Sequence, residues 1–236
     1  MSGPSQDLFP PPYAESKDIL VNHSKSSWMR LYVPTTSLNG GVASKKLPLV
    51  VYFHSGSFIS YTVDSAVFNA GCNLIASPTH RPVPKNKLPE AYDDGVDLLE
   101  WIKNNSEEDE WLKSYADLSN VFLMGTGTGG NVAYNVGLRF TEKDLTPLSI
   151  RGLILLSPFF GVDVTVGAGP DNLEKIKRSG WKVMVTGVRG GAMIDRQRDV
   201  AKLMKEKGVD VVERFTDVDD RDEFASIRSF IYSSAP

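Results

Sequence analysis

The stretch VFLMGTGTGGNVAYNVGLR, residues 121–139, contains the most informative pattern of this chain. Four apolar residues, typical of a buried strand, run into a glycine-rich turn, and a helical pattern of apolar residues follows. A strand, a sharp turn and a helix in this order can carry a catalytic serine at the apex of the turn. The apex here is Gly127, between Thr126 and Thr128, so the turn has no serine.

Similar apolar runs and helical patterns alternate on both sides of this stretch. Two short strands are expected at 18–22 and 28–34, and further apolar runs lie at 47–53, 72–77, 150–157, 181–187 and 209–215. Apolar residues at spacings of three and four predict helices at 90–104, 130–140, 193–207 and 221–233. This alternation predicts an α/β fold, a twisted and mostly parallel sheet with helices on both faces.

The chain shows no internal repeat and no change of composition that would mark a domain boundary. Residues 1–17 are rich in proline, serine and other polar residues, which is typical of a mobile arm. We therefore expect this arm to precede a single domain over residues 18–236. The first two strands are expected to pair antiparallel at one edge of the sheet.

The composition excludes several classes of partner. The chain has 236 residues, a net charge of −3 and 41% apolar residues, with acidic and basic residues interspersed. The absence of a basic stripe argues against nucleic acid, and no apolar run approaches the ~20 residues of a membrane span. A single cysteine, Cys72, excludes a disulfide framework within the chain. We expect a soluble, cytoplasmic protein with neither nucleic acid nor membrane as partner; the oligomeric state stays open.

The glycine-rich turn also fits the fingerprint of dinucleotide-binding loops. The glycines of Gly125–Gly130 have the spacing G-x-G-x-x-G between a strand and a helix. That fingerprint also needs an acidic residue at the end of the next strand, about 20 residues later. Glu142 and Asp144 lie near this distance, but they precede the strand at 150–157 and so fall at its wrong end. Nucleotide binding is therefore kept as the less favoured alternative, and no cofactor is expected.

Several long motifs, in one order, resemble the plant carboxylesterases of the α/β-hydrolase superfamily. The plant carboxylesterases are relatives of the hormone-sensitive-lipase group and of the gibberellin receptor. The motifs are LPLVVYFHSGSF, SPTHRPVPKNKLPEAYDDGVDLLEWI, VFLMGTGTGGNVAYNVGLR, IRGLILLSPFFG and MIDRQRDVAKLMKEKGVDVVERF. The resemblance spans residues 18 to 232 and implies an α/β-hydrolase-like fold.

The resemblance also assigns a role to each motif position. The family's elbow G-x-S-x-G-G-N places Gly127 at the position of the nucleophile, with Thr126 and Thr128 beside it. Its oxyanion motif H-G-G-G-F corresponds to His54–Phe58, in which Ser55, Gly56 and Ser57 stand for the three glycines. A vestigial pocket is predicted, lined by His54, Ser55, Gly56, Ser57, Thr126 and Thr128.

The acid and the base of the family's triad are also missing from their expected positions. In GVRGGAMIDRQ, Gly191 stands where the family has its aspartate, while Asp195 matches a non-catalytic position. The family's base follows the last strand, but the histidines are His23, His54 and His80, and none follows residue 80. A serine hydrolase needs an imidazole to remove the proton from its hydroxyl. The resemblance thus implies that the triad is absent.

Two further segments bear on a metal site and on the lid. The acidic run Asp217–Glu223 lacks the glycine and the terminal glutamate spacing of a calcium loop, so no metal is expected. The segments 68–72 and 162–180 are shorter than the family pattern, which predicts shortened lid and cap segments.

The main prediction is a non-catalytic relative of the plant carboxylesterases. It would be a pseudoenzyme or an engineered minimal scaffold that at most binds a small molecule in the vestigial pocket. The alternative is a carboxylic-ester hydrolase with an unusual catalytic arrangement.

Overall fold

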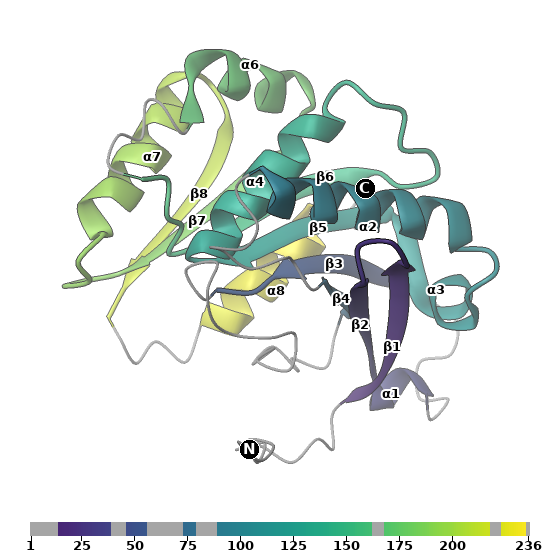
Figure 1. Ribbon diagram of the computed structural model, residues 1–236. Coiled ribbons are helices and arrows are strands. Elements are labelled where there is room, and N and C mark those ends of the chain that lie inside the picture. The colour runs from purple at the N-terminus through teal and green to yellow at the C-terminus, as the bar shows by residue number, and fades with distance from the viewer. Residues whose placement is uncertain are drawn as a thin grey trace, which may run out of the picture.

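The computed structural model of the protein describes residues 14–38, 46–55, 73–78, 89–161, 168–217 and 223–234. These residues form one eight-stranded sheet (Figure 1). Its strands along the chain are β1 (Ala14–Asn22), β2 (Ser27–Pro34), β3 (Leu47–Phe53), β4 (Leu74–Pro78), β5 (Ala116–Thr126), β6 (Ile150–Leu156), β7 (Lys182–Val188) and β8 (Asp210–Thr216). The helices are α1 (Thr35–Leu38), α2 (Glu90–Asn105), α3 (Glu110–Tyr115), α4 (Thr128–Phe140), α6 (Pro170–Arg178), α7 (Ile194–Glu206) and α8 (Glu223–Ser233).

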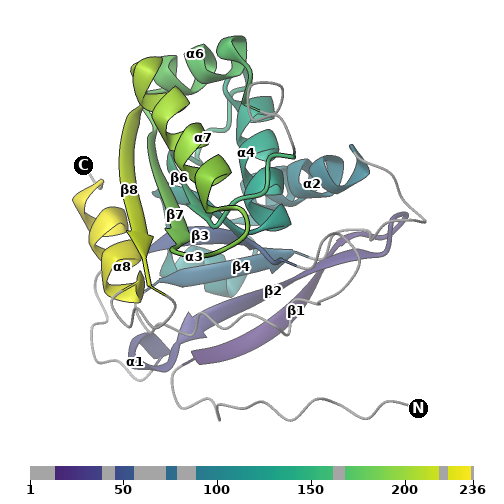
Figure 2. The same ribbon diagram turned by 90° about the vertical axis from the view of Figure 1, so that its left-hand side faces the viewer.

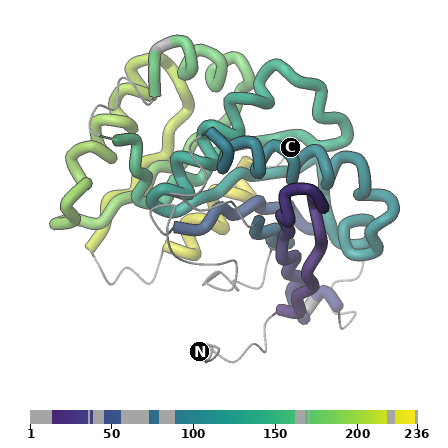
Figure 3. Tube along the Cα trace, in the orientation of Figure 1, coloured from purple at the N-terminus to yellow at the C-terminus, as the bar shows by residue number. Residues whose placement is uncertain are grey.

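The strand order of the sheet is β1-β2-β4-β3-β5-β6-β7-β8. β1 pairs with β2 and β2 with β4 in antiparallel fashion, and every other neighbouring pair is parallel. The predicted antiparallel pair at one edge and the predicted neighbours β3, β5 and β6 are thereby confirmed. Figure 3 follows the chain from the hairpin at that edge to β8 at the opposite edge.

Helices cover both faces of the sheet, as the sequence predicts. α2, α4 and α7 lie on one face, and α8 lies on the other (Figure 2). Two apolar clusters result, because side chains alternate between the faces of a strand. The larger cluster joins the sheet to α2, α4, α6 and α7, and the smaller one joins alternate residues of the central strands to Ile227, Phe230 and Ile231 of α8. The carboxyl ends of the parallel strands meet at one edge, where ligands bind in sheets of this kind.

Some elements differ from the expected ones. β1 begins at Ala14, so residues 14–17 belong to a strand, whereas the composition had predicted a mobile arm up to residue 17. The division of the chain into an arm and a domain remains a prediction. α3 was not predicted because it has only six residues; the Asp109 side chain caps it by accepting hydrogen bonds from the N–H groups of Trp111 and Leu112. α6 was not predicted either, and β5 is longer than the apolar run 121–124 because it starts directly after α3.

The helices of the described residues include none with both the length and the apolar character that crossing a membrane requires.

Candidate functional site

A sharp turn at Gly127 joins the carboxyl end of β5 to α4. Gly127 has φ 56° and ψ −117° and is the N-cap of α4. Its N–H donates to the Leu156 carbonyl at 2.9 Å, and its own carbonyl accepts from the N–H groups of Gly130 at 3.1 Å and Phe159 at 2.9 Å. Three backbone hydrogen bonds therefore hold the turn. A residue with a Cβ would be strained in this conformation, so glycine suits it.

The chain beyond β3 brings His54 and Ser55 to the same edge of the sheet. The His54 imidazole is 5% exposed, and its Nδ1 lies 2.7 Å from the carbonyl oxygen of Ser55. Because a carbonyl only accepts hydrogen bonds, Nδ1 carries the proton in this contact. Burial lowers the pKa of the His54 side chain, and the hydrogen bond to Ser55 opposes this shift. The imidazole is therefore neutral near pH 7.

Ser55 and Gly127 are neighbours in the fold although 72 residues separate them. A Cβ built on Gly127 would lie 2.8 Å from the Ser55 Oγ and 3.7 Å from the Ser55 Cβ. Real Cβ atoms essentially never come within 3.0 Å of such an atom, so the contact with the Ser55 Oγ is too short, whereas the contact with the Ser55 Cβ is ordinary. The Ser55 hydroxyl therefore occupies the direction in which the elbow would project a side chain.

The two threonines beside Gly127 have different environments. The Thr126 Oγ1 lies 3.1 Å from the hydroxyl oxygen of Tyr52, a β3 residue whose phenol pKa is raised by burial. Thr128, the first residue of α4, is 8% exposed, and its hydroxyl has no hydrogen-bond partner among the described residues. A buried hydroxyl without a partner costs about 1–3 kcal/mol. Among the described residues, the Thr128 hydroxyl therefore has hydrogen-bonding capacity that no group of the elbow uses.

Two neighbouring strands end near the elbow in the parallel sheet. Ser157, directly after β6, has φ 44°, and its N–H donates to the Thr186 hydroxyl of β7 at 3.3 Å. Gly191 follows β7, and its N–H donates to the Val188 carbonyl at 3.0 Å. A Cβ on Gly191 would lie 2.9 Å from that carbonyl oxygen. An aspartate at position 191 would therefore require the turn to shift.

The structure thus brings together part of the site predicted from the sequence. His54, Ser55 and the elbow residues 126–128 lie at one sheet edge, whereas Gly56 and Ser57 lie outside the described residues. Sequence reasoning missed Tyr52 and Thr186, which contact this region from strand positions. The alternation of β3 could have indicated the face on which Tyr52 lies, but not its contact with Thr126.

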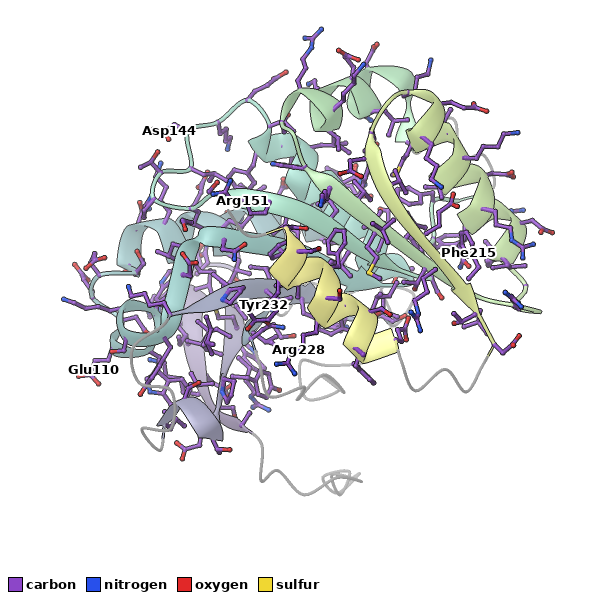
Figure 4. The ribbon with its side chains drawn as sticks, turned by 180° about the vertical axis from the view of Figure 1, so that it is seen from behind. Glu110, Asp144, Arg151, Phe215, Arg228 and Tyr232 are labelled. Atoms are coloured by element: carbon purple, nitrogen blue, oxygen red, sulfur yellow. The ribbon has the colours of Figure 1, made fainter. Side chains whose placement is uncertain are left out.

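Residues 218–222 of the acidic run Asp217–Glu223 lie outside the part of the chain that the structure describes. There, no group of three or more His, Cys, Asp or Glu side chains could hold a metal ion. A surface depression of about 420 Å³ is lined by Ala225, Arg228, Ser229 and Tyr232, all from α8. Figure 4 labels Arg228 and Tyr232 on this helix, which covers the sheet face opposite α4. The depression therefore includes none of the elbow residues.

The fold of this chain is also found in solved esterase structures. The thermophilic carboxylesterase EstE1 from a metagenomic library superposes with a TM-score of 0.73 at 18% identity, covering 97% of this chain and 92% of that chain. An esterase of Pyrobaculum calidifontis superposes with a TM-score of 0.69 at 18% identity, covering 95% of this chain and 86% of that chain. At this level of identity the similarity concerns the fold alone.

Sequence relatives are considerably closer. Carboxylesterase 20 of Arabidopsis thaliana is 45% identical over 282 residues, which covers 93% of this chain and 86% of the relative. The 3-O-acetylpapaveroxine carboxylesterase CXE2 of Papaver somniferum is 34% identical over 251 residues, covering 83% and 80%. The first alignment is longer than this chain of 236 residues, so the relative contains internal segments that this chain lacks. This agrees with the prediction of shortened segments.

A family model described as the α/β-hydrolase fold matches residues 50–183, more than half of the chain. The matched region contains the elbow, the central strands β5 and β6, and β3 from residue 50 onward. Together with a relative that is 45% identical over nearly the whole chain, this match shows that the protein belongs to the plant carboxylesterase family of α/β-hydrolases.

Proposed function

We propose that this protein binds carboxylic esters, or the carboxylic acids derived from them, at the elbow without rapid Ser-His-Asp turnover. The observation that carries the proposal is the elbow itself, whose backbone is held at Gly127 by three hydrogen bonds that need no side chain. The turn can thus position a ligand even though no nucleophile projects from residue 127.

Two features of α4 favour a ligand with a carbonyl or carboxylate group. The N–H groups at the start of a helix attract groups of negative charge, and α4 begins at this turn. The buried Thr128 hydroxyl at the same helix start lacks a hydrogen-bond partner. An ester carbonyl or a carboxylate could supply an acceptor to both.

The substrate class comes from the relatives. Two of them are named carboxylesterases and align with more than four fifths of this chain. A site that keeps the fold of such enzymes is best suited to the same class of ligand.

The sequence of this chain lacks groups that rapid turnover needs. Residue 127 has no side chain, and no histidine follows His80 that could serve as the family's base. A serine hydrolase without its triad keeps a residual acceleration of about 10³–10⁴ over water from binding and oxyanion stabilisation.

A second candidate function is hydrolysis of carboxylic esters through an unusual catalytic arrangement. It is favoured by the names of the relatives and by the Ser55 hydroxyl, which lies where an elbow side chain would project. The neutral imidazole of His54 precedes it in the chain.

Two measurements on the purified protein test these proposals. Turnover of p-nitrophenyl butyrate is expected to stay within about 10⁴-fold of the reaction in buffer. Fluorine NMR is expected to show saturable binding of a trifluoromethyl hexyl ketone, an uncleavable ester mimic. Rapid turnover would favour the second candidate, and the absence of any ketone binding would contradict the first.

A further inference from the structure

The side chain of Ser55 fills space that a carboxylesterase elbow keeps for its own residue. Its Oγ is the nearest heavy atom to a Cβ built on Gly127, at 2.8 Å. A serine at position 127 would extend in this same direction. A hydroxyl therefore still occupies the direction of the elbow side chain, but Ser55, two residues beyond the end of β3, supplies it.

The backbone around Ser55 is held in place by the residue before it. The buried His54 imidazole donates its Nδ1–H to the Ser55 carbonyl oxygen at 2.7 Å. This contact fixes the peptide that follows the Ser55 Cα. The hydroxyl thus projects from a residue whose backbone carbonyl is hydrogen-bonded to the buried His54.

The Ser55 hydroxyl is available to a ligand. The side chain is partly exposed, and the hydrogen bonds of the described residues include none made by its Oγ. A serine hydroxyl can donate one hydrogen bond and accept others. It is therefore suited to contact the carbonyl oxygen of an ester or a carboxylate oxygen.

We propose that Ser55 is a specificity-determining residue whose hydroxyl donates a hydrogen bond to the carbonyl or carboxylate oxygen of the ligand beside Gly127. This inference rests on the proposed function, since it assumes that the elbow binds such a ligand. The contact is non-covalent, because a serine hydroxyl needs a base to become a nucleophile. Residues 54, 55 and 127 then recognise the ester where the family cleaves it.

The test compares Ser55→Ala with wild type in fluorine NMR titrations of the trifluoromethyl hexyl ketone. One neutral hydrogen bond contributes about 0.5–1.5 kcal/mol, so the ketone should bind about 2–10-fold more weakly to the variant. The matched control is Ser119→Ala, near the start of β5, which should leave the affinity unchanged. Ser55→Gly provides the same comparison if Ser55→Ala is unstable.

A second ligand separates recognition of the polar group from a change of pocket shape. A trifluoromethyl alkane of the same length has no oxygen that could accept a hydrogen bond. Its affinity should be the same for wild type and Ser55→Ala. An equal loss for both ligands would indicate a structural role and overturn the proposal.

The remaining outcomes are also decisive. Ketone binding that Ser55→Ala leaves unchanged would overturn the role of Ser55 but leave the proposed function intact. The absence of ketone binding by wild type would overturn both. A tetrahedral adduct signal that disappears in Ser55→Ala would replace the hydrogen-bonding role with a nucleophilic one.

Discussion

The backbone of Gly129, in the first turn of α4, passes directly beside the carbonyl group of Phe53 at the end of β3. A Cβ on Gly129 would lie 2.1 Å from the Phe53 oxygen. Both partners are backbone, so neither can move aside as a flexible side chain would. This contact sets the distance between the elbow helix and the strand end that carries His54 and Ser55.

The first prediction concerns this contact. Gly129→Ala should destabilise the protein by more than about 3 kcal/mol or prevent folding, because only a backbone shift can remove the overlap. The control is Gly137→Ala in the same helix, where the nearest atoms to a Cβ belong to side chains, those of Leu153 and Trp181 at 3.2 Å and of Leu123 at 3.5 Å. Urea denaturation compares the two free energies of unfolding. Equal effects would contradict the interpretation.

The second prediction concerns the pair of Ser55 and Gly127. Gly127→Ser should destabilise the protein more than Gly180→Ser, because both glycines have positive φ but only Gly127 has a neighbour in the way. The strain of positive φ alone costs about 1–2 kcal/mol. In the double variant with Ser55→Gly, the destabilisation by Gly127→Ser beyond that of Gly180→Ser should disappear. A double-mutant cycle of unfolding free energies in urea measures this coupling. Neither variant is expected to gain rapid turnover of p-nitrophenyl butyrate, and additive effects would show that the two positions do not interact.

The third prediction separates stability from binding at Thr128. Thr128→Val removes a buried hydroxyl that has no partner among the described residues and keeps the branched shape. The free energy of unfolding should therefore be unchanged or higher by up to about 1 kcal/mol. Binding of the trifluoromethyl hexyl ketone should weaken, because the ligand loses a hydrogen bond. Thermal unfolding and fluorine NMR provide the two measurements. A clear loss of stability with unchanged binding would mean that the hydroxyl serves the fold.

The fourth prediction concerns pH. Burial lowers the pKa of folded His54 below its ordinary value of 6.5, so acidification protonates the unfolded state first. The free energy of unfolding should therefore be highest above pH 6.5 and fall as the pH decreases towards the lower pKa of His54 in the folded protein. In His54→Asn, whose amide can keep the donor without titrating, the free energy of unfolding should depend less on pH between about 5 and 7. His23→Gln, in the exposed turn after β1, is the matched control for the removal of an imidazole.

The fifth prediction separates an elbow from a nucleotide loop at Gly125–Gly130. A ligand at 100 times its dissociation constant adds about 2.7 kcal/mol to the free energy of unfolding. For a protein of this size that raises Tm by several degrees. Millimolar NAD, NADP or ATP should produce no resolvable shift. A saturable shift with one nucleotide, abolished by Gly127→Val, would favour the nucleotide alternative.

Hydrophobic patterns made most of the sheet predictable from the sequence. The strands that are buried on both faces, such as β3 and β6, have continuous apolar runs that match their observed bounds closely. α3 escaped prediction because six residues are too few for a periodic pattern, although Asp109 before it is a typical capping residue. α6 was overlooked because its segment was interpreted as a shortened lid, although Leu173 and Ile176 have helical spacing.

The site was less predictable than the sheet. Motif positions identified His54, Ser55 and Gly127 individually, but their proximity depends on the pairing of β3 with β5, which are far apart in the chain. The contact of Tyr52 with Thr126 arises from the same pairing. Side-chain directions at strand ends are set by tertiary packing, so a sequence pattern cannot supply them.

The backbone hydrogen bonds at Gly127 have a consequence for how such proteins diversify. Since main-chain groups of Leu156, Phe159 and Gly130 hold the turn, the hydrogen bonds that shape it need no side chain at residue 127. The architecture of the elbow and the chemistry performed there are thus encoded by different atoms. A change of residue at this position therefore keeps the three hydrogen bonds of the elbow, although a residue with a Cβ adds strain.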